Sequence, residues 1–169
     1  MTQTLYLLRH ARAEPWSPGG DDFTRKLSDR GRRHMLELAA WAKGELPPPD
    51  RILCSASQRT RDTLEPLLET WPGLTGKTTY MHDIYEASTG TLHEIVRRAF
   101  DESQTLMMVG HNPGFEYLAQ AVLRDQDAAG INKMSTGTLA VIDFGGGYED
   151  ACGNGRLRHW VKRGDLSID

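Results

Sequence analysis

The sequence predicts an α/β fold: a three-layer α/β/α sandwich in which helices cover both faces of a mostly parallel sheet. Short runs of consecutive apolar residues recur along the chain, and such runs are typical of strands buried on both faces. Segments with apolar residues at spacings of three and four lie between these runs, as expected for amphipathic helices. Strands that alternate with helices are typical of βαβ units, which build parallel sheets.

Length and composition favour one globular domain spanning residues 1–169. Apolar residues make up 38% of the chain and charged residues 25%, as in ordinary globular proteins. The net charge of −3 provides no bulk attraction for nucleic acid. We expect no membrane association and a cytoplasmic location, because the sequence has neither a membrane-spanning apolar run nor a signal-peptide pattern. Cys54 and Cys152 do not suggest a disulfide framework.

The first half of the chain predicts two strands and two helices. The apolar run Leu5–Leu8 predicts the first strand, and a loop follows over residues 15–22. A helix is expected from Ser28, its N-cap, to about Lys43, because Gly44 and three prolines come next. Residues 51–55 predict a second strand, and a helix follows with Ser57 as a possible N-cap. Pro66 lies inside that helix and predicts a kink or an early end.

The second half continues the alternation. Residues 78–81 form a weaker strand candidate, and the capping-box pattern of Thr91 and Glu94 predicts the start of a third helix. The apolar run 105–109 predicts another strand, and Asn112 and Pro113 are the N-cap and first residue expected for a fourth helix. Residues 137–144 and 156–161 predict two final strands. The glycines at 145–147 resemble a phosphate-binding loop, but no helix follows them, which favours a flexible hairpin connection.

The candidate functional residues begin with Arg9 and His10, which directly follow the first apolar run. Open α/β sheets place their ligand sites at the carboxyl ends of the strands. There, a neutral imidazole can attack phosphorus while a neighbouring guanidinium binds the phosphoryl oxygens. An isolated Arg-His pair could equally do no more than terminate a strand. The functional interpretation therefore requires partners from elsewhere in the chain.

Two further strand ends provide such partners. His111 follows the strand predicted at 105–109, just before a helix N-terminus, and Arg59 lies in the first turn of the helix that follows residues 51–55. Helix N-terminal amides together with a guanidinium can bind an anion. Arg59 alone could be an exposed helix residue. Its occurrence with Arg9, His10 and His111 at corresponding strand ends favours a phosphoryl-binding site.

These segments resemble the motifs of the histidine phosphatase superfamily, also called the phosphoglycerate mutase-like fold. Residues 8–11 are similar to its Arg-His-Gly motif, with Ala11 in place of the commoner glycine, and residues 55–63 to its Ser-x-x-x-Arg-x-x-x-Thr element. Residues 109–114 resemble its second histidine motif, and residues 27–31 its Leu-Ser/Thr-x-x-Gly element. The resemblance covers nearly the whole chain and is strongest to the short bacterial phosphohistidine phosphatases of the SixA type.

The resemblance implies a role for each residue. His10 would be the phosphorylated nucleophile, and Arg9, Arg59 and His111 would form the phosphate pocket. Ala11 requires a backbone that avoids positive φ at that position. We expect neither a metal nor another cofactor, because two arginines supply the positive charge and no cluster of ligating residues has metal-binding spacing.

A general acid is needed when the leaving group is an alkoxide, and relatives with ester substrates use an acidic residue between the arginine motif and the second histidine. Residues 84–87 resemble the Tyr-Glu pattern of such members, which makes Glu86 the first choice and Asp83 the second. Alternatively, Glu86 is a solvated loop carboxylate or caps the helix near Thr91. The other histidines, at positions 34, 82, 93 and 159, are interpreted as structural.

The substrate class is inferred from a short connection. Only 22 residues separate Thr63 from Glu86, whereas the mutases and sugar-bisphosphatases of the superfamily carry a large helical insertion there. An uncovered pocket favours a phosphatase that removes phosphate from phosphohistidine on a protein. A phosphomonoesterase acting on small phosphate esters and a non-catalytic phosphate-binding module remain alternatives.

Overall fold

Six strands form a single sheet in the order β3-β2-β4-β1-β5-β6 in the computed structural model, which describes residues 1–150 and 152–166. The strands are β1 (Gln3–Arg9), β2 (Arg51–Ser55), β3 (Thr78–Met81), β4 (Thr105–Gly110), β5 (Leu139–Phe144) and β6 (Arg156–Val161). Neighbouring strands from β3 to β1 are parallel, and β5 runs antiparallel to both β1 and β6. The predicted mostly parallel sheet is confirmed.

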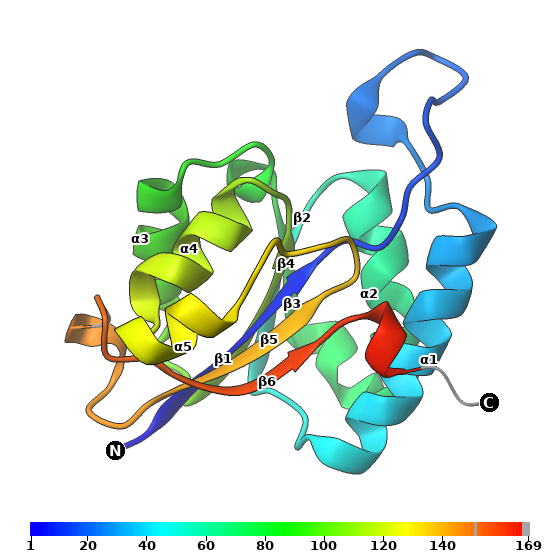
Figure 1. Cartoon of the computed structure of the whole chain (residues 1–169). Helices are drawn as coiled ribbons and strands as arrows, with labels where there is room; N and C mark the ends of the chain where they lie inside the picture. The colour runs from blue at the N-terminus through cyan, green and yellow to red at the C-terminus, as the bar shows by residue number, and fades with distance from the viewer. Residues whose placement is uncertain (151, 167–169) are drawn as a thin grey trace.

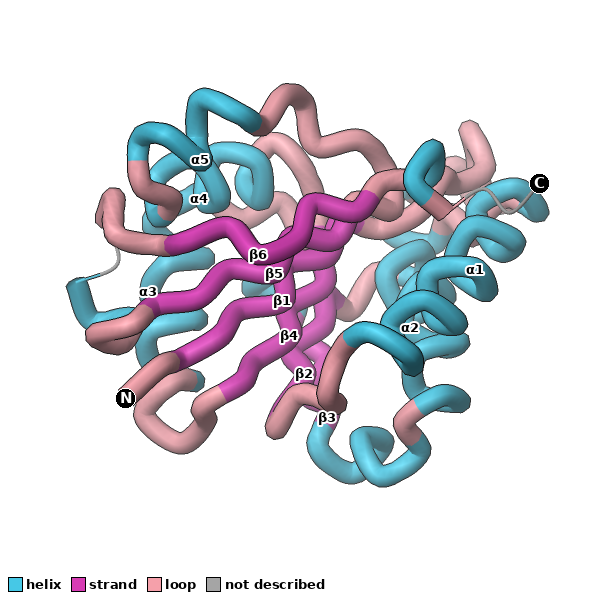
Figure 2. Tube along the Cα trace, turned by 60° about the horizontal axis from the view of Figure 1, so that its bottom comes forward, coloured by secondary structure: helices cyan, strands magenta, loops and turns pink. Residues whose placement is uncertain are grey.

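Helices cover both faces of this sheet (Figures 1 and 2). They are α1 (Asp29–Glu45), α2 (Gln58–Thr70), α3 (Thr89–Ala99), α4 (Gly114–Val122) and α5 (Asp125–Gly130). Five short 3₁₀ segments complete the described elements: η1 (Asp22–Thr24), η2 (Pro72–Lys77), η3 (His82–Ile84), η4 (Tyr148–Asp150) and η5 (Arg163–Asp165). The helices α1 and α2 lie on one face and α3, α4 and α5 on the other, which confirms the three-layer sandwich.

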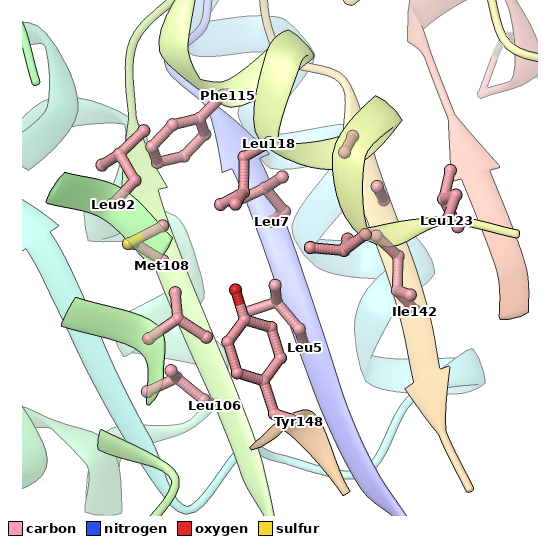
Figure 3. Close-up of a cluster of buried hydrophobic side chains, with 14 of the residues drawn as sticks. Leu5, Leu7, Leu92, Leu106, Met108, Phe115, Leu118, Leu123, Ile142 and Tyr148 are labelled. Atoms are coloured by element: carbon pink, nitrogen blue, oxygen red, sulfur yellow. The ribbon is translucent and has the colours of Figure 1, made fainter. Parts of the chain in front are cut away.

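Strand β1 is packed on both of its faces. Leu5 and Leu7 belong to the apolar cluster under α3 and α4, whereas Tyr6 and Leu8 belong to the cluster under α1 and α2. Figure 3 shows Leu7 beside Leu118 of α4 and Leu5 beside the Tyr148 ring. Each such buried side chain stabilises the fold by about 1.5–3 kcal/mol. The residues at the end of β1 are therefore carried by a rigid part of the core.

Several predicted boundaries were wrong by a few residues. The helix α1 continues through Gly44, and α2 continues past Pro66 to Thr70. An internal proline costs about 3 kcal/mol, and burial of Leu64 and Leu67 against the core offsets a cost of that size. The expected early end at Pro66 is therefore not observed.

The starts of α3 and α4 also differ from the prediction. Ser88 is the N-cap of α3, and its Oγ accepts a hydrogen bond from the Thr91 amide at 3.2 Å. Glu94 instead pairs with Arg97 at 2.8 Å, so the capping box predicted at Thr91 was wrong. In α4, Asn112 lies one residue before the N-cap position, but its Oδ1 still accepts a hydrogen bond from the Glu116 amide.

Candidate active site

Strands β1 and β4 place His10 and His111 side by side. Arg9 of β1 and Gly110 of β4 are paired in the parallel register, so the residues that follow them leave the same edge of the sheet. The His10 amide donates to the Gly110 carbonyl at 2.9 Å, and the His10 and His111 ring centroids lie 5.3 Å apart. The expected convergence of the two histidines is found in the structure.

The His10 ring is held in one tautomer. Its Nδ1 lies 2.7 Å from the Ala11 carbonyl oxygen, and because a carbonyl only accepts hydrogen bonds, Nδ1 carries the proton and Nε2 keeps its lone pair. Burial lowers the pKa of His10 to about 4, and the positive charges of Arg59 and Arg9 add to this effect. His10 is therefore a neutral imidazole at neutral pH, with Nε2 free to act as a nucleophile.

The His111 ring contacts serine hydroxyl groups through its Nε2 atom. Its Nε2 lies 2.8 Å from Ser55 Oγ, which itself accepts a hydrogen bond from the Ser57 amide at 3.4 Å. When the Ser55 hydroxyl donates to His111 Nε2, the ring proton lies on Nδ1, and this is the tautomer in which Nδ1 can donate to an oxyanion. Burial lowers the pKa of His111 to about 3, and the neighbouring His10 and Arg59 add to this effect because each disfavours a second positive charge.

Arg59 is oriented by a carboxylate from the loop before α1. The Arg59 side chain is buried, and its Nη1 and Nη2 donate to the backbone oxygen and to Oδ2 of Asp22 at 2.8 and 3.1 Å. Tyr85 also donates its hydroxyl to Asp22 Oδ2, at 2.5 Å. The hydrogen bond from Tyr85, with the neighbouring Arg59, lowers the pKa of Asp22 and keeps it ionised. Asp22 was not among the site residues predicted from the sequence, because it lies in the short η1 segment, where no motif marks it.

Three hydrogen-bond donors at this edge have no partner among the described residues. They are Nε of Arg9, Nε of Arg59 and Nδ1 of His111, and all three atoms are buried. The Arg9 Nη1 is occupied, since it donates to the Met134 carbonyl at 2.9 Å. Buried donors without partners are rare and costly. Two guanidinium groups and a neutral imidazole N–H are the arrangement expected for a site that binds a tetrahedral oxyanion.

The backbone around His10 is fixed by hydrogen bonds to two other segments. The Ala11 amide donates to Thr63 Oγ1 at 3.0 Å, and the Thr63 hydroxyl donates to the Arg59 carbonyl at 2.7 Å. The Gly137 amide donates to the His10 carbonyl at 2.9 Å. Ala11 is buried and does not have a positive φ, so alanine meets the backbone requirement at this position.

Glu86 lies in an exposed turn next to the site. It is the one non-glycine residue with positive φ in the described part of the chain, at 54°. The ring of its neighbour Tyr85 lies 5.4 Å from that of His111. Ala87 is close to the start of α4, because a Cβ on Gly114 would lie 2.7 Å from the Ala87 oxygen. The alternative that Glu86 caps α3 is wrong, since Ser88 is the cap. Asp83 is exposed in η3.

Within residues 1–150 and 152–166, no group of three or more histidine, cysteine, aspartate or glutamate side chains is arranged to hold a metal ion. Among the same residues, no helix has the length and hydropathy needed to span a membrane.

The lowered pKa values of His10 and His111 predict how the stability of the fold depends on pH. We expect the free energy of unfolding to fall as the pH is lowered from about 6.5 toward about 4. In that interval the unfolded histidines, with ordinary pKa values near 6.5, bind protons that the folded ones do not. Above about pH 6.5 the two histidines are neutral in both states, so their stabilising contribution to the free energy of unfolding is fully present.

Urea unfolding at several pH values in a phosphate-free buffer measures this dependence. The variant His10→Gln should show a shallower loss of stability than the wild type over the same interval. An identical loss in both proteins would show that His10 is not held neutral by the fold.

Comparisons with known proteins agree with this geometry. The family model for the histidine phosphatase superfamily (branch 1) matches residues 5–124. An uncharacterized protein of Mycobacterium tuberculosis is 32% identical over 149 residues, which cover 85% of this chain and 90% of that protein.

Solved structures with similar folds include two that are provisionally assigned as phosphohistidine phosphatase SixA. The protein from Agrobacterium tumefaciens has a TM-score of 0.83 and 30% identity, over 95% of this chain and 97% of its own. The protein from Nakamurella multipartitia has a TM-score of 0.82 and 25% identity, over 96% of each chain.

Proposed function

The chain belongs to the histidine phosphatase superfamily (branch 1), and from this membership and the geometry of the site we propose a phosphatase that works through a phosphohistidine at His10. The observation that carries the proposal is the convergence of an unprotonated His10 Nε2 with three buried donors, those of Arg9, Arg59 and His111.

In the first step, His10 Nε2 attacks the phosphorus of the substrate. A P–N bond forms, and the bond from phosphorus to the leaving group breaks with its electron pair going to the leaving group. The Nδ1 proton stays on the hydrogen bond to the Ala11 carbonyl, so the positive charge that develops on the imidazole is stabilised there. Arg9, Arg59 and His111 donate to the phosphoryl oxygens as their charge is redistributed.

In the second step, water attacks the phosphohistidine, and phosphate leaves with the original imidazole regenerated. The same donors hold the phosphoryl group in both steps, so no rearrangement of the pocket is required. Preorganised donors of this kind are worth most in a buried site, where water does not compete with them.

We assign to Glu86 the proton transfer to the leaving group in the first step and from water in the second. The exposed turn next to Tyr85 and its positive φ support this assignment, because backbone strain of about 1–3 kcal/mol is concentrated at functional sites. A leaving imidazole needs this proton less than a leaving alkoxide does.

The substrate that fits best is phosphohistidine on a protein. Between α2 and α3 the chain forms only η2, β3 and η3, so no helical insertion covers the edge of the sheet that carries His10. A side chain that projects from a folded partner can then reach the pocket. A preference for small phosphate esters would instead favour the phosphomonoesterase alternative.

Glu86→Gln tests the substrate assignment. We expect the substitution to lower kcat/KM for an alkyl phosphate by about 10²–10⁴-fold, the usual contribution of a general acid. We expect a much smaller loss with a phosphohistidine protein. The measurement is the ratio of wild-type to variant kcat/KM for each substrate.

Asp83→Asn is measured in parallel, since Asp83 is the second choice for the general acid and an exposed carboxylate of the same segment. A larger loss in Asp83→Asn than in Glu86→Gln on the alkyl phosphate would move the role to Asp83. Equal losses on both substrates for Glu86→Gln would make Glu86 a binding or structural residue. A wild-type enzyme that prefers the alkyl phosphate would move the assignment to a phosphomonoesterase.

Asp22→Asn is expected to lower kcat about tenfold with a smaller change in KM. The reason is that Asp22 orients Arg59, much as residues behind a metal ligand orient that ligand. Asp22 binds the two terminal nitrogens of Arg59, and the Nε of Arg59 has no partner among the described residues. Steady-state kinetics on p-nitrophenyl phosphate separate the two parameters. A change confined to KM would indicate that Asp22 competes with substrate for Arg59 rather than orienting it.

A further inference from the structure

A second basic site lies next to the candidate active site. A hollow of about 190 Å³ is lined by Arg12, Arg30, Gly31, His34, Ser135, Thr136 and Arg163. These residues come from the segment after His10, the first turns of α1, the loop before β5 and the short η5. Figure 1 shows η5, in red, beside α1. Because one water occupies about 30 Å³ of liquid, the hollow accommodates a single side chain or small anion.

The charge in this hollow is unbalanced. The side chains of Arg12, Arg30 and Arg163 make no hydrogen bond or ion pair with any residue in 1–150 or 152–166. Within the same residues, six other arginines pair with a carboxylate. The lining contains hydroxyl groups and an imidazole but no acidic side chain. The composition is therefore that of an anion site, in a chain whose net charge is −3.

His34 adds an independent observation. The residue is only 5% exposed, and its Nε2 is the fourth buried side-chain atom without a partner in the described part of the chain. The other three belong to the candidate active site. Sequence reasoning interpreted His34 as structural, and as a core residue it would be expected to have both ring nitrogens satisfied or in contact with solvent. His34 thus brings a buried imidazole into the wall of the hollow, beside the three arginines.

The hollow is connected directly to the backbone of the catalytic histidine. Arg12 stands two residues after His10, so their Cα atoms are at most about 7 Å apart. Gly137 lies over the His34 ring, where a Cβ would be 2.3 Å from Cε1, and its amide donates to the carbonyls of Arg9 and His10. Gly31 fixes the other wall, because a Cβ there would lie 2.2 Å from the Arg12 oxygen.

We propose that this hollow binds a carboxylate of the protein substrate, from an aspartate or glutamate side chain close to the phosphohistidine. Guanidinium groups bind carboxylates through paired, charge-assisted hydrogen bonds. Arg12 and Arg30 are exposed at the rim, where a partner's surface can reach them. This proposal rests on the proposed function, and it adds a preference for acidic residues beside the phosphorylated histidine.

The kinetic test uses two synthetic phosphohistidine peptides that differ only in carrying glutamate or glutamine beside the phosphohistidine. We expect the wild type to prefer the acidic peptide by about tenfold in kcat/KM, the effect of about one charge-assisted contact. The double variant Arg12→Gln/Arg30→Gln should lose this preference and retain wild-type activity on p-nitrophenyl phosphate. The preference should also shrink at high salt, because charges at an exposed rim are screened.

Arg33→Gln is the matched control, since Arg33 is an exposed arginine of α1 that does not line the hollow. The proposal would be overturned if the wild type showed no preference, if the double variant kept it, or if the control lost it as well. An equal loss on p-nitrophenyl phosphate would also overturn it, because the arginines would then belong to the phosphoryl pocket.

A binding measurement separates this proposal from the proposed function. In the inactive variant His10→Ala, the unphosphorylated glutamate peptide should shift the backbone amide NMR signals of Arg30 and Thr136, and the glutamine peptide should not. This result supports the carboxylate site even when no hydrolysis is measured. Equal shifts with both peptides would overturn the carboxylate site and leave the phosphatase assignment untouched.

Discussion

His10→Ala is expected to lower kcat on p-nitrophenyl phosphate by at least about 10⁴-fold, as removal of a covalent nucleophile does in other enzymes. The reason is the state of the ring: its Nδ1 is committed to the Ala11 carbonyl, and burial and nearby arginines keep its pKa near 4. Its Nε2 is thus an available nucleophile near the positive charges of Arg59 and Arg9. Steady-state rates of the purified variant measure the effect.

His159→Ala provides the control for this experiment. His159 lies on β6, where its ring packs against Trp41 at a centroid distance of 5.2 Å, outside the candidate site. The control should retain wild-type kcat. A His10→Ala enzyme with more than about a tenth of wild-type kcat would contradict nucleophilic catalysis, since general binding effects alone would then account for the rate.

Arg59→Ala is expected to lower kcat/KM by about 10²–10³-fold, or about 2.7–4 kcal/mol of transition-state stabilisation. Arg59 is one of the two guanidinium groups with a buried Nε available to the phosphoryl oxygens, and Asp22 holds it in place. The variant Arg59→Lys keeps the charge but loses the planar fork, so it should recover only part of the activity.

Arg61→Ala is the matched control, because Arg61 belongs to the same helix but is exposed and stacks on the Tyr80 ring at 4.1 Å. It should retain wild-type kcat/KM. Full recovery in Arg59→Lys would contradict the account, since a positive charge without bidentate geometry would then be sufficient.

The sequence was most informative where a residue is fixed by the core. The apolar runs within β1 and β4 identified both strands, and parallel pairing then brought His10 and His111 together. Arg59 followed from its place in the first turn of α2. These positions depend on which strands are buried and in which direction they run, and short apolar runs in the sequence indicate both.

The features that the sequence did not predict depend on contacts between segments that are distant in the chain. Asp22 reaches Arg59 across 37 positions of the chain, from η1, a segment whose composition predicts only an irregular loop. The start of α3 was misplaced because Ser88 and Thr91 are both acceptable caps, and only the fold selects Ser88. The hollow beside Arg12 could not be predicted either, since four separate segments build it.

Trapping the covalent intermediate tests the central claim most directly. The wild-type enzyme is mixed with ³²P-labelled substrate, quenched rapidly without acid, and digested for peptide mapping. We expect a label on His10 that is lost in acid and stable in base, as is typical of a phosphoramidate. A label on another residue, or turnover with no trapped phosphoenzyme on His10 even under single-turnover conditions, would contradict it.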